Sequence, residues 1–471
     1  MTAQARPTRG RRGRRTWSVI LLLGAVLTEL TAGLVGLRHV AAADAARSAP
    51  QAHPAPAIPT RVDARPGTPD YSGGLGDRPA ERAERTAAVR DLLDRRASAL
   101  LHRDRTGFLA TVDPRSGAFR TRQAALFDNL AQVPLGSWAY RLDPDFTEPV
   151  SEPAFARYDG PVWAPMVTLR YALRGFDPVP TERPQYLTFV RRDGRWYTAS
   201  DTDFDARGDH TWRGLWDFGP VLAYQGTASL VLAHPRGADR LETFADVVDA
   251  AVPHVTRVWG ADWSQRVVVL IPDTQQEMSQ VIGEQFALSH IAAVATADYT
   301  DAHTHTVRGQ RVVVNPSNLD RLGEAGRRIV LRHEITHVAT RAATGGSAPT
   351  WLVEGFADYV GYLDAGVPVT VAAQELRAEV RRGSVPVRLP TDTEFDGDNP
   401  RLPQSYEEAW FACRLLAARI GQDGVVRFYR MVGSATGDPG EAVSRALRAT
   451  AHLSRDQFIT EWRHMLVSEL S

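Results

Sequence analysis

The stretch "RHEITHVATRAATGGSAPTWLVEGFADY", residues Arg332 to Tyr359, decides how this part of the chain folds. His333 and His337 are four residues apart, so an α-helix places both imidazoles on one face. Gly345-Gly346 predicts the end of that helix, and Pro349 predicts the start of another. The pattern therefore predicts two helices that fold back against each other.

Two histidines on one face supply half of a tetrahedral zinc site, which needs a third protein ligand and an open position for water. Glu354 on the second helix can supply that ligand, and Asp358 lies one turn later on the same face. There its carboxylate can accept the free ring N–H of His333. Glu334 suits a general base that does not bind the metal. The sequence thus predicts one Zn²⁺ per chain, held by His333, His337 and Glu354; the alternative interpretation is a solvated histidine and glutamate surface.

"HEITH" followed by "WLVEGFADY" resembles the gluzincin metallopeptidases, specifically the peptidase MA-like domains whose motif is similar to that of the aminopeptidase N family. The resemblance covers residues 226–471. It implies a zinc metallopeptidase that hydrolyses peptide bonds through metal-activated water, with Glu334 as general base and acid. It also implies a small mixed sheet, the motif helices and a helical C-terminal part. Because such enzymes commonly use a tyrosine to stabilise the oxyanion, Tyr406 is a catalytic candidate, with a packing tyrosine at a helix start as the alternative. His303 and His305 are further residues that can approach the site.

Residues 80–205 form a separate unit, which begins with a helical stripe of leucines and continues with strand signals. Asp193-Gly194 between two β-rich runs is a strong hairpin signal. The unit therefore reads as a compact α+β domain. Its "DGRW" turn resembles that of the NTF2-like cone fold, so the whole chain is expected to be α+β, an NTF2-like domain followed by a gluzincin domain.

The remaining segments connect these units or precede them. Residues 1–45 begin with six arginines within residues 1–15, followed by an apolar stretch long enough to cross a bilayer, which predicts a single-pass anchor with the catalytic domain outside the cell membrane. The alternative is a signal peptide followed by secretion. Residues 46–79 are rich in Pro, Ala and Gly and read as a linker, and residues 206–225 read as a connector.

The formal charge balances at 55 basic and 55 acidic residues, so no global basic field favours a nucleic-acid partner. The expected partners are a peptide or protein substrate and, through the N-terminal helix, the membrane. Enzymes of the aminopeptidase N family bind the free amino end of a substrate through an acidic residue in a "GAMEN"-type edge-strand motif. No such string precedes His333, and the nearest equivalent, "HIAAVATADYT", offers only Asp298, so an endopeptidase is favoured over an aminopeptidase. Two other functions remain open: an inactive, peptidase-like surface binding protein, and a zinc hydrolase of a non-peptide amide or ester.

Overall fold

The computed structural model describes residues 78–148, 156–282, 291–301, 304, 306–397 and 399–471. Residues 1–77, on which the anchor, the signal peptide and nearly all of the linker were predicted, lie outside the described residues. Among the helices that the structure describes, none has the length and apolarity needed to span a bilayer.

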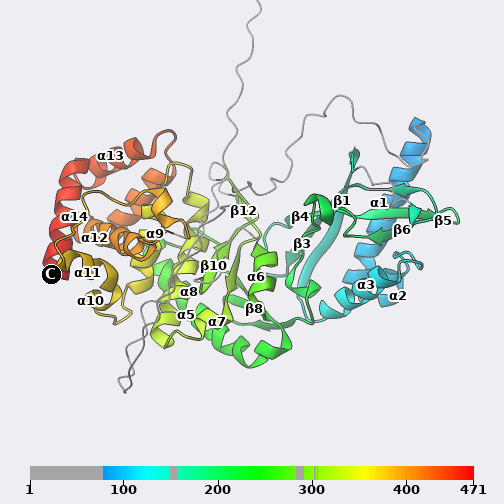
Figure 1. Ribbon diagram of the computed structural model, residues 1–471, viewed down its shortest axis with the longest axis horizontal. Coiled ribbons are helices and arrows are strands. Elements are labelled where there is room, and N and C mark those ends of the chain that lie inside the picture. The colour runs from blue at the N-terminus through cyan, green and yellow to red at the C-terminus, as the bar shows by residue number, and fades with distance from the viewer. Residues whose placement is uncertain (1–77, 149–155, 283–290, 302–303, 305, 398) are drawn as a thin grey trace, which may run out of the picture.

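Helices precede strands in the N-terminal unit, at the right of Figure 1. Its strands form two antiparallel sheets of three strands each, in the orders β1-β3-β4 and β2-β5-β6. The predicted hairpin joins β5 to β6, and Asp193 and Gly194 have φ angles of 47° and 78°, as its tight turn requires. The unit is α+β, and its NTF2-like identity stays a prediction. Its elements are α1 (Pro79–Leu101), α2 (Arg105–Leu109), α3 (Gly117–Asn129), β1 (Leu135–Thr147), β2 (Val162–Trp163), β3 (Pro165–Leu173), β4 (Thr181–Gln185), β5 (Thr188–Arg192) and β6 (Arg195–Ser200).

A mixed sheet of five strands forms the centre of the molecule, in the order β10-β13-β9-β8-β7. The strand β9 is parallel to both of its neighbours, and the two outer pairs are antiparallel. Because β7 belongs to this sheet, the second unit begins before the predicted boundary at residue 226. The elements here are β7 (Leu222–Gln225), β8 (Ser229–Ala233), α5 (Leu241–Trp259), β9 (Val267–Ile271), α6 (Gln275–Ile282), β10 (Ala293–Thr296), β11 (Tyr299–Asp301), β12 (Thr306–Arg308), β13 (Arg311–Val314) and α7 (Pro316–Leu319).

The chain after the sheet is helical, and these helices lie at the left of Figure 1. The long helix α12 contains a kink at Gly421, whose φ of 71° only glycine adopts readily. A capping box opens the last helix, since the Ser454 and Gln457 side chains each accept a hydrogen bond from the other residue's backbone N–H. The helices are α8 (Glu324–Thr340), α9 (Thr350–Tyr362), α10 (Val369–Ala372), α11 (Gln374–Arg381), α12 (Leu402–Gly433), α13 (Pro439–Thr450) and α14 (Arg455–Leu470).

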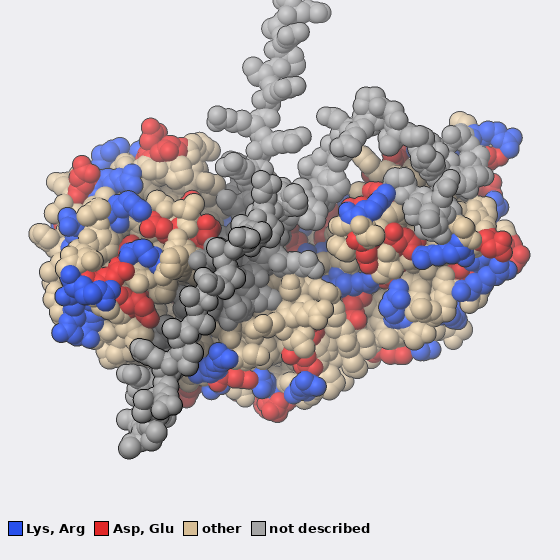
Figure 2. Space-filling view, viewed as in Figure 1, with Lys and Arg blue, Asp and Glu red and all other residues tan. Residues whose placement is uncertain are grey.

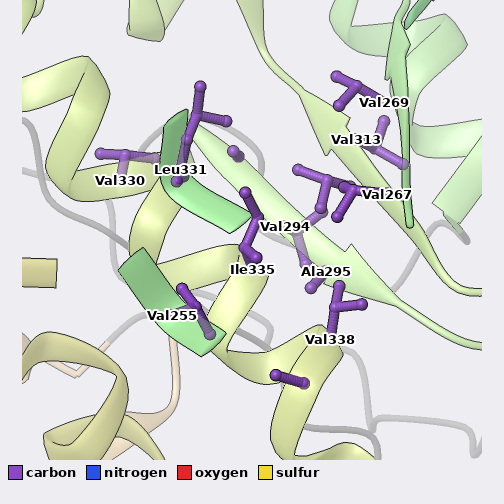
Figure 3. Close-up of a cluster of buried hydrophobic side chains, with 14 of the residues drawn as sticks. Val255, Val267, Val269, Val294, Ala295, Val313, Val330, Leu331, Ile335 and Val338 are labelled. Carbon is purple, nitrogen blue, oxygen red and sulfur yellow. The ribbon is translucent and has the colours of Figure 1, made fainter. Parts of the chain in front are cut away.

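The apolar side of α8 packs on the sheet, and this contact fixes the helix that carries the two histidines. Ile335 is fully buried and lies between Val255 of α5 and the strands, while Val338 reaches toward β10 (Figure 3). Burying an isoleucine contributes about 1.5 to 3 kcal/mol. The opposite side of α8, which carries the two histidines, therefore faces away from the sheet and toward α9.

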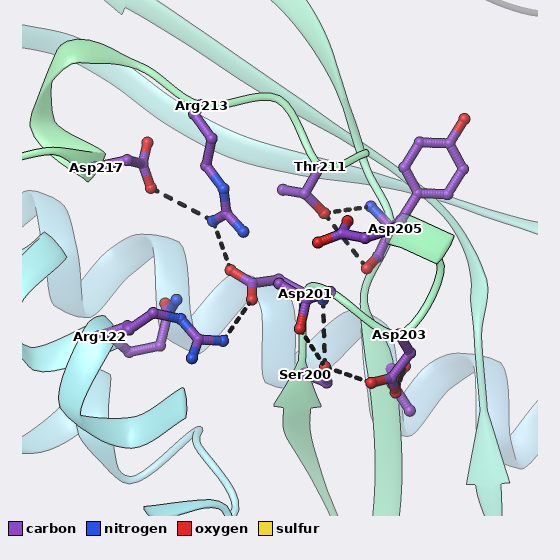
Figure 4. A network of polar contacts seen from close by, with 12 residues as sticks. Arg122, Ser200, Asp201, Asp203, Asp205, Thr211, Arg213 and Asp217 are labelled. Atoms are coloured by element: carbon purple, nitrogen blue, oxygen red, sulfur yellow. Dashed lines mark hydrogen bonds and ion pairs between the residues drawn. The ribbon is translucent and has the colours of Figure 1, made fainter. Parts of the chain in front are cut away.

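Ion pairs join the N-terminal unit to the rest. Asp177, just after β3, accepts two hydrogen bonds of 2.8 Å from the guanidinium of Arg311 in β13, and both side chains are buried. The connector is held to the N-terminal unit in the same way. Its Arg213 forms an ion pair with Asp201, which also binds Arg122 of α3 (Figure 4). Basic and acidic side chains alternate over the visible face of the molecule (Figure 2).

Candidate metal centre

His333 and His337 lie on the same side of α8, with their Nε2 atoms 2.9 Å apart. Both side chains are buried, at 0% and 3% exposure. The α-helix ends at Thr340 and continues as one short 3-10 turn, Arg341–Ala343, so it ends slightly before the predicted Gly345-Gly346.

The second helix, α9, begins after Pro349 as predicted and carries Glu354. Its Oε2 atom lies 3.4 Å from Nε2 of His333 and 3.5 Å from Nε2 of His337. The three candidate ligand atoms lie within 4.8 Å of one another, and all three residues are buried. The structure therefore brings together the three residues that the sequence predicts as metal ligands.

Close packing at a glycine holds α9 in this position. A Cβ atom on Gly355 would lie 2.3 Å from the carbonyl oxygen of Ala409 in α12, so only glycine fits there. On the opposite side, a Cβ on Gly361 would lie 3.0 Å from the carbonyl oxygen of Ile329 in α8. Because α9 is pressed between its two neighbours, Glu354 has little freedom to move away from the histidines.

The carboxylate of Glu354 makes this cluster suitable for a cation. Both of its oxygens are buried, and neither has a hydrogen-bond partner. Its contacts of 3.4 and 3.5 Å with the two imidazoles do not replace the hydration that a buried carboxylate loses, and a cation between the three groups would. Two imidazole nitrogens and one carboxylate are also the donor set of many catalytic zinc sites. The residues present therefore fit Zn²⁺.

The charges around the cluster set the state of each imidazole. Burial lowers the pKa of His337 to about 4, so its ring is neutral at pH 7, as a metal ligand requires. Burial would also lower the pKa of His333, but the carboxylates of Asp358 and Glu354 raise it to about 10. Asp358 Oδ1 lies 2.8 Å from Nδ1 of His333. An ionised carboxylate only accepts hydrogen bonds, so Nδ1 carries a proton toward Asp358 whether the ring is charged or neutral, and Nε2 is the nitrogen left to bind a metal.

Glu334 points to a different neighbour from the two histidines. Its Oε2 atom accepts a 2.7 Å hydrogen bond from the backbone N–H of Ala295 in β10, the edge strand of the sheet. The other oxygen, Oε1, is buried and has no hydrogen-bond partner. Burial raises the pKa of Glu334 to about 8. The carboxyl group is thus well placed to hold a proton near neutral pH.

Tyr406 lies beside His333, with ring centroids 6.5 Å apart. The sequence predicted that this tyrosine opens a helix, but α12 begins earlier, at Leu402, and Tyr406 is buried in its second turn. Phe395 packs edge-on against its ring. The location is compatible with the proposed catalytic role, which stays a prediction. His303 and His305 lie outside the described residues.

The sequence did not single out Arg341. Its Nη2 atom donates a 2.7 Å hydrogen bond to the carbonyl oxygen of Ala295. The signal was available, since Arg341 follows His337 by four residues and so shares its side of the helix. Glu334 and Arg341 together thus bind both polar backbone groups of Ala295.

No family model matches the sequence, and no curated protein is similar to it. Similar solved structures include an M1 zinc metallopeptidase from Deinococcus radiodurans (16% identity, TM-score 0.32) and a mutant bound to a Tyr-Ser-Ala substrate (17%, 0.31), each match covering 58% of both chains. A mutant two-domain M1 zinc metallopeptidase bound to L-arginine has 14% identity and a TM-score of 0.30 over 60% of this chain and 58% of its own. The present chain thus matches less than two thirds of each structure. At these values the likeness assigns no activity, which has to be argued from the residues of the site.

Proposed function

We propose that this chain is a zinc-dependent peptidase. The observation that carries the proposal is the convergence of His333, His337 and Glu354, whose ligand atoms lie within 4.8 Å of one another in a buried cluster. Glu334 follows the first of these residues directly and has one free carboxylate oxygen. Such a cluster next to a buried acid is the arrangement that metal-assisted hydrolysis needs.

The residues of the chain have separate tasks in this reaction. His333, His337 and Glu354 would hold the zinc, which when bound polarises the scissile carbonyl and makes a water molecule acidic. Glu334 takes the proton of the attacking water and passes it to the leaving nitrogen.

Two further residues support the chemistry. Asp358 keeps the ring of His333 in one tautomer through its hydrogen bond to Nδ1. Tyr406 is proposed to donate a hydrogen bond to the oxyanion as the carbonyl is attacked.

We also propose that the enzyme cuts internal peptide bonds. An aminopeptidase needs a carboxylate that binds the free ammonium group of its substrate. Asp298, the nearest candidate in the sequence, is buried and forms an ion pair with Arg183 of the N-terminal unit. Its charge is therefore engaged inside the protein. A peptide offered with a free and with an acetylated N-terminus tests this point, because stepwise loss of residues from the free form alone would indicate an aminopeptidase.

The proposed location is the outer face of the cell membrane, with residues 1–45 as anchor and secretion after cleavage as the alternative. The arginines ahead of the apolar stretch support this orientation. Protease added to intact cells should remove the domains after the linker. Digestion that occurs only after lysis would place them inside.

The decisive experiment replaces the base and leaves the ligands unchanged. Glu334→Gln should retain about one zinc per chain and lose hydrolysis of a broad peptide library, whereas His337→Ala should lose both. Full metal-dependent turnover by the Gln variant would refute the role of Glu334. Zinc binding without turnover by the natural chain would favour the inactive binding protein. Turnover of esters or non-peptide amides alone would favour the other hydrolase.

A further inference from the structure

Arg341 lies at the junction of the metal-binding helix and the edge strand. It follows His337 by one helical turn, and its guanidinium binds the carbonyl oxygen of Ala295. The neighbouring N–H of the same residue binds Glu334. One residue of the edge strand thus contacts both the general base and this arginine.

These two groups of Ala295 are the ones that an added strand would use. In an antiparallel pair, the N–H and C=O of one residue point to the same side and bond to one partner residue. An extended substrate pairing with Ala295 would therefore displace Glu334 and Arg341 together. Displacement frees Glu334 for its role as base, and it leaves the arginine in need of a new acceptor.

The guanidinium of Arg341 forms no direct ion pair with the described residues, although the carboxylates of Glu334 and Glu354 attract it from farther away. No carboxylate of the described residues lies within 4 Å of its guanidinium, whereas Arg311 and Arg183 each form an ion pair with a buried aspartate. Arg341 is half-buried, and burial lowers its pKa to about 10. It remains charged at neutral pH, so a carboxylate would be a stronger acceptor than the backbone carbonyl it now contacts.

We propose that Arg341 is a specificity-determining residue, which binds a carboxylate of the substrate close to the scissile bond. The inference rests on the proposed peptidase function and adds a substrate class to it. The carboxylate can belong to an Asp or Glu side chain or to the C-terminus of a short peptide. Both present two oxygens in a plane, which the guanidinium fork binds through two hydrogen bonds.

The test compares peptides of one cleavable sequence that carry Glu, Gln or Lys at single positions on either side of the cut bond. A second pair has a free or an amidated C-terminus, which separates the two sources of the carboxylate. We expect the natural enzyme to cleave the best acidic peptide with a kcat/KM about 10- to 100-fold above its neutral counterpart, the range of a hydrogen-bonded charge. Arg341→Glu should remove this preference and favour Lys at the same position.

Two controls show that the effect is local. Arg463→Glu makes the same charge change at an exposed site on α14 and should keep the acidic preference. Arg341→Lys retains the charge without the planar fork and should keep a weaker preference. An Arg341→Glu variant with an unchanged substrate preference would overturn the proposal.

Binding measurements make the inference independent of turnover. Fluorescently labelled Glu and Gln peptides are titrated with the Glu334→Gln variant, with and without Arg341→Glu. Tighter binding of the acidic peptide that depends on Arg341 supports the inference even if no peptide is cleaved, an outcome that would refute only the proposed function. Equal affinity for both peptides would refute the inference and leave the peptidase proposal intact.

Discussion

Replacing Asp358 by asparagine tests how far a residue outside the ligand set controls the metal. Asp358 Oδ1 lies 2.8 Å from Nδ1 of His333, and both side chains are buried. Asparagine has nearly the same shape, so packing between α8 and α9 is preserved. What is lost is the negative charge, together with a group that can only accept a hydrogen bond.

The size of the effect follows from this loss. An amide can present its NH₂ group to Nδ1, which would shift the ring proton to Nε2 and block the nitrogen that faces the cluster. The neutral amide also lacks the negative charge by which Asp358 increases the basicity of the His333 ring. Removal of such a partner typically weakens zinc affinity about 10- to 100-fold, which corresponds to about 1.4 to 2.7 kcal/mol. The three ligands themselves remain, so zinc binding should be weakened and not abolished.

Zinc affinity is measured by competition with a fluorescent chelator at constant pH. The matched control is Asp364→Asn, because Asp364 is exposed two residues after α9 and has a φ of 57°, a conformation that asparagine also adopts. The control should bind zinc like the natural chain. If Asp358→Asn and the control have the same affinity, the hydrogen bond to His333 has no effect on the metal and the reasoning is wrong.

Three further predictions concern stability. Asp177→Asn leaves Arg311 buried without its carboxylate and should lower the free energy of unfolding, measured in urea, by about 3 to 5 kcal/mol. Gly355→Ala forces a methyl group against the backbone of α12, so it should lower both Tm and zinc affinity, whereas unchanged values would show that the helices separate easily. Burial raises the pKa of Asp217 to about 6, so the folded state favours the protonated carboxyl group. The contribution of Asp217 to the free energy of unfolding therefore falls as pH rises from about 4 to 6. The free energy of unfolding of Asp217→Asn, relative to that of the natural chain, should therefore increase by about 1 to 3 kcal/mol between pH 4 and pH 7. A difference between the two proteins that does not change with pH would contradict the assigned pKa.

Local spacing was sufficient to predict the arrangement of the candidate ligands. Residues four apart on a helix share a face, and a turn followed by Pro349 returns the second helix toward the first. These rules depend on neighbours in the sequence, so no knowledge of the tertiary structure was needed to place Glu354 opposite the histidines. The Asp193-Gly194 hairpin was predictable for the same reason, since its two central residues alone determine the turn.

Contacts between distant segments were beyond this kind of reasoning. The hydrogen bonds of Ala295 to Glu334 and Arg341 depend on how α8 crosses the edge of the sheet, and that crossing is set by packing of Ile335 and its neighbours. Strand β7 was missed because four residues, three of them half-buried and one exposed, give too short a pattern to separate a strand from a connector. Arg311 and its partner Asp177 are 134 residues apart, a distance at which sequence patterns do not identify partners.

Two buried ion pairs between the units also bear on the site. Arg311 of β13 is paired in register with Thr296 of β10, and Asp298 follows the end of the same edge strand. Their partners, Asp177 and Arg183, both belong to the N-terminal unit. Because a buried charge without its partner is strongly destabilising, separating the N-terminal unit from the edge strand would be costly. The N-terminal unit is therefore part of the structure that holds Ala295 against Glu334 and Arg341, although it contributes no residue to the metal cluster.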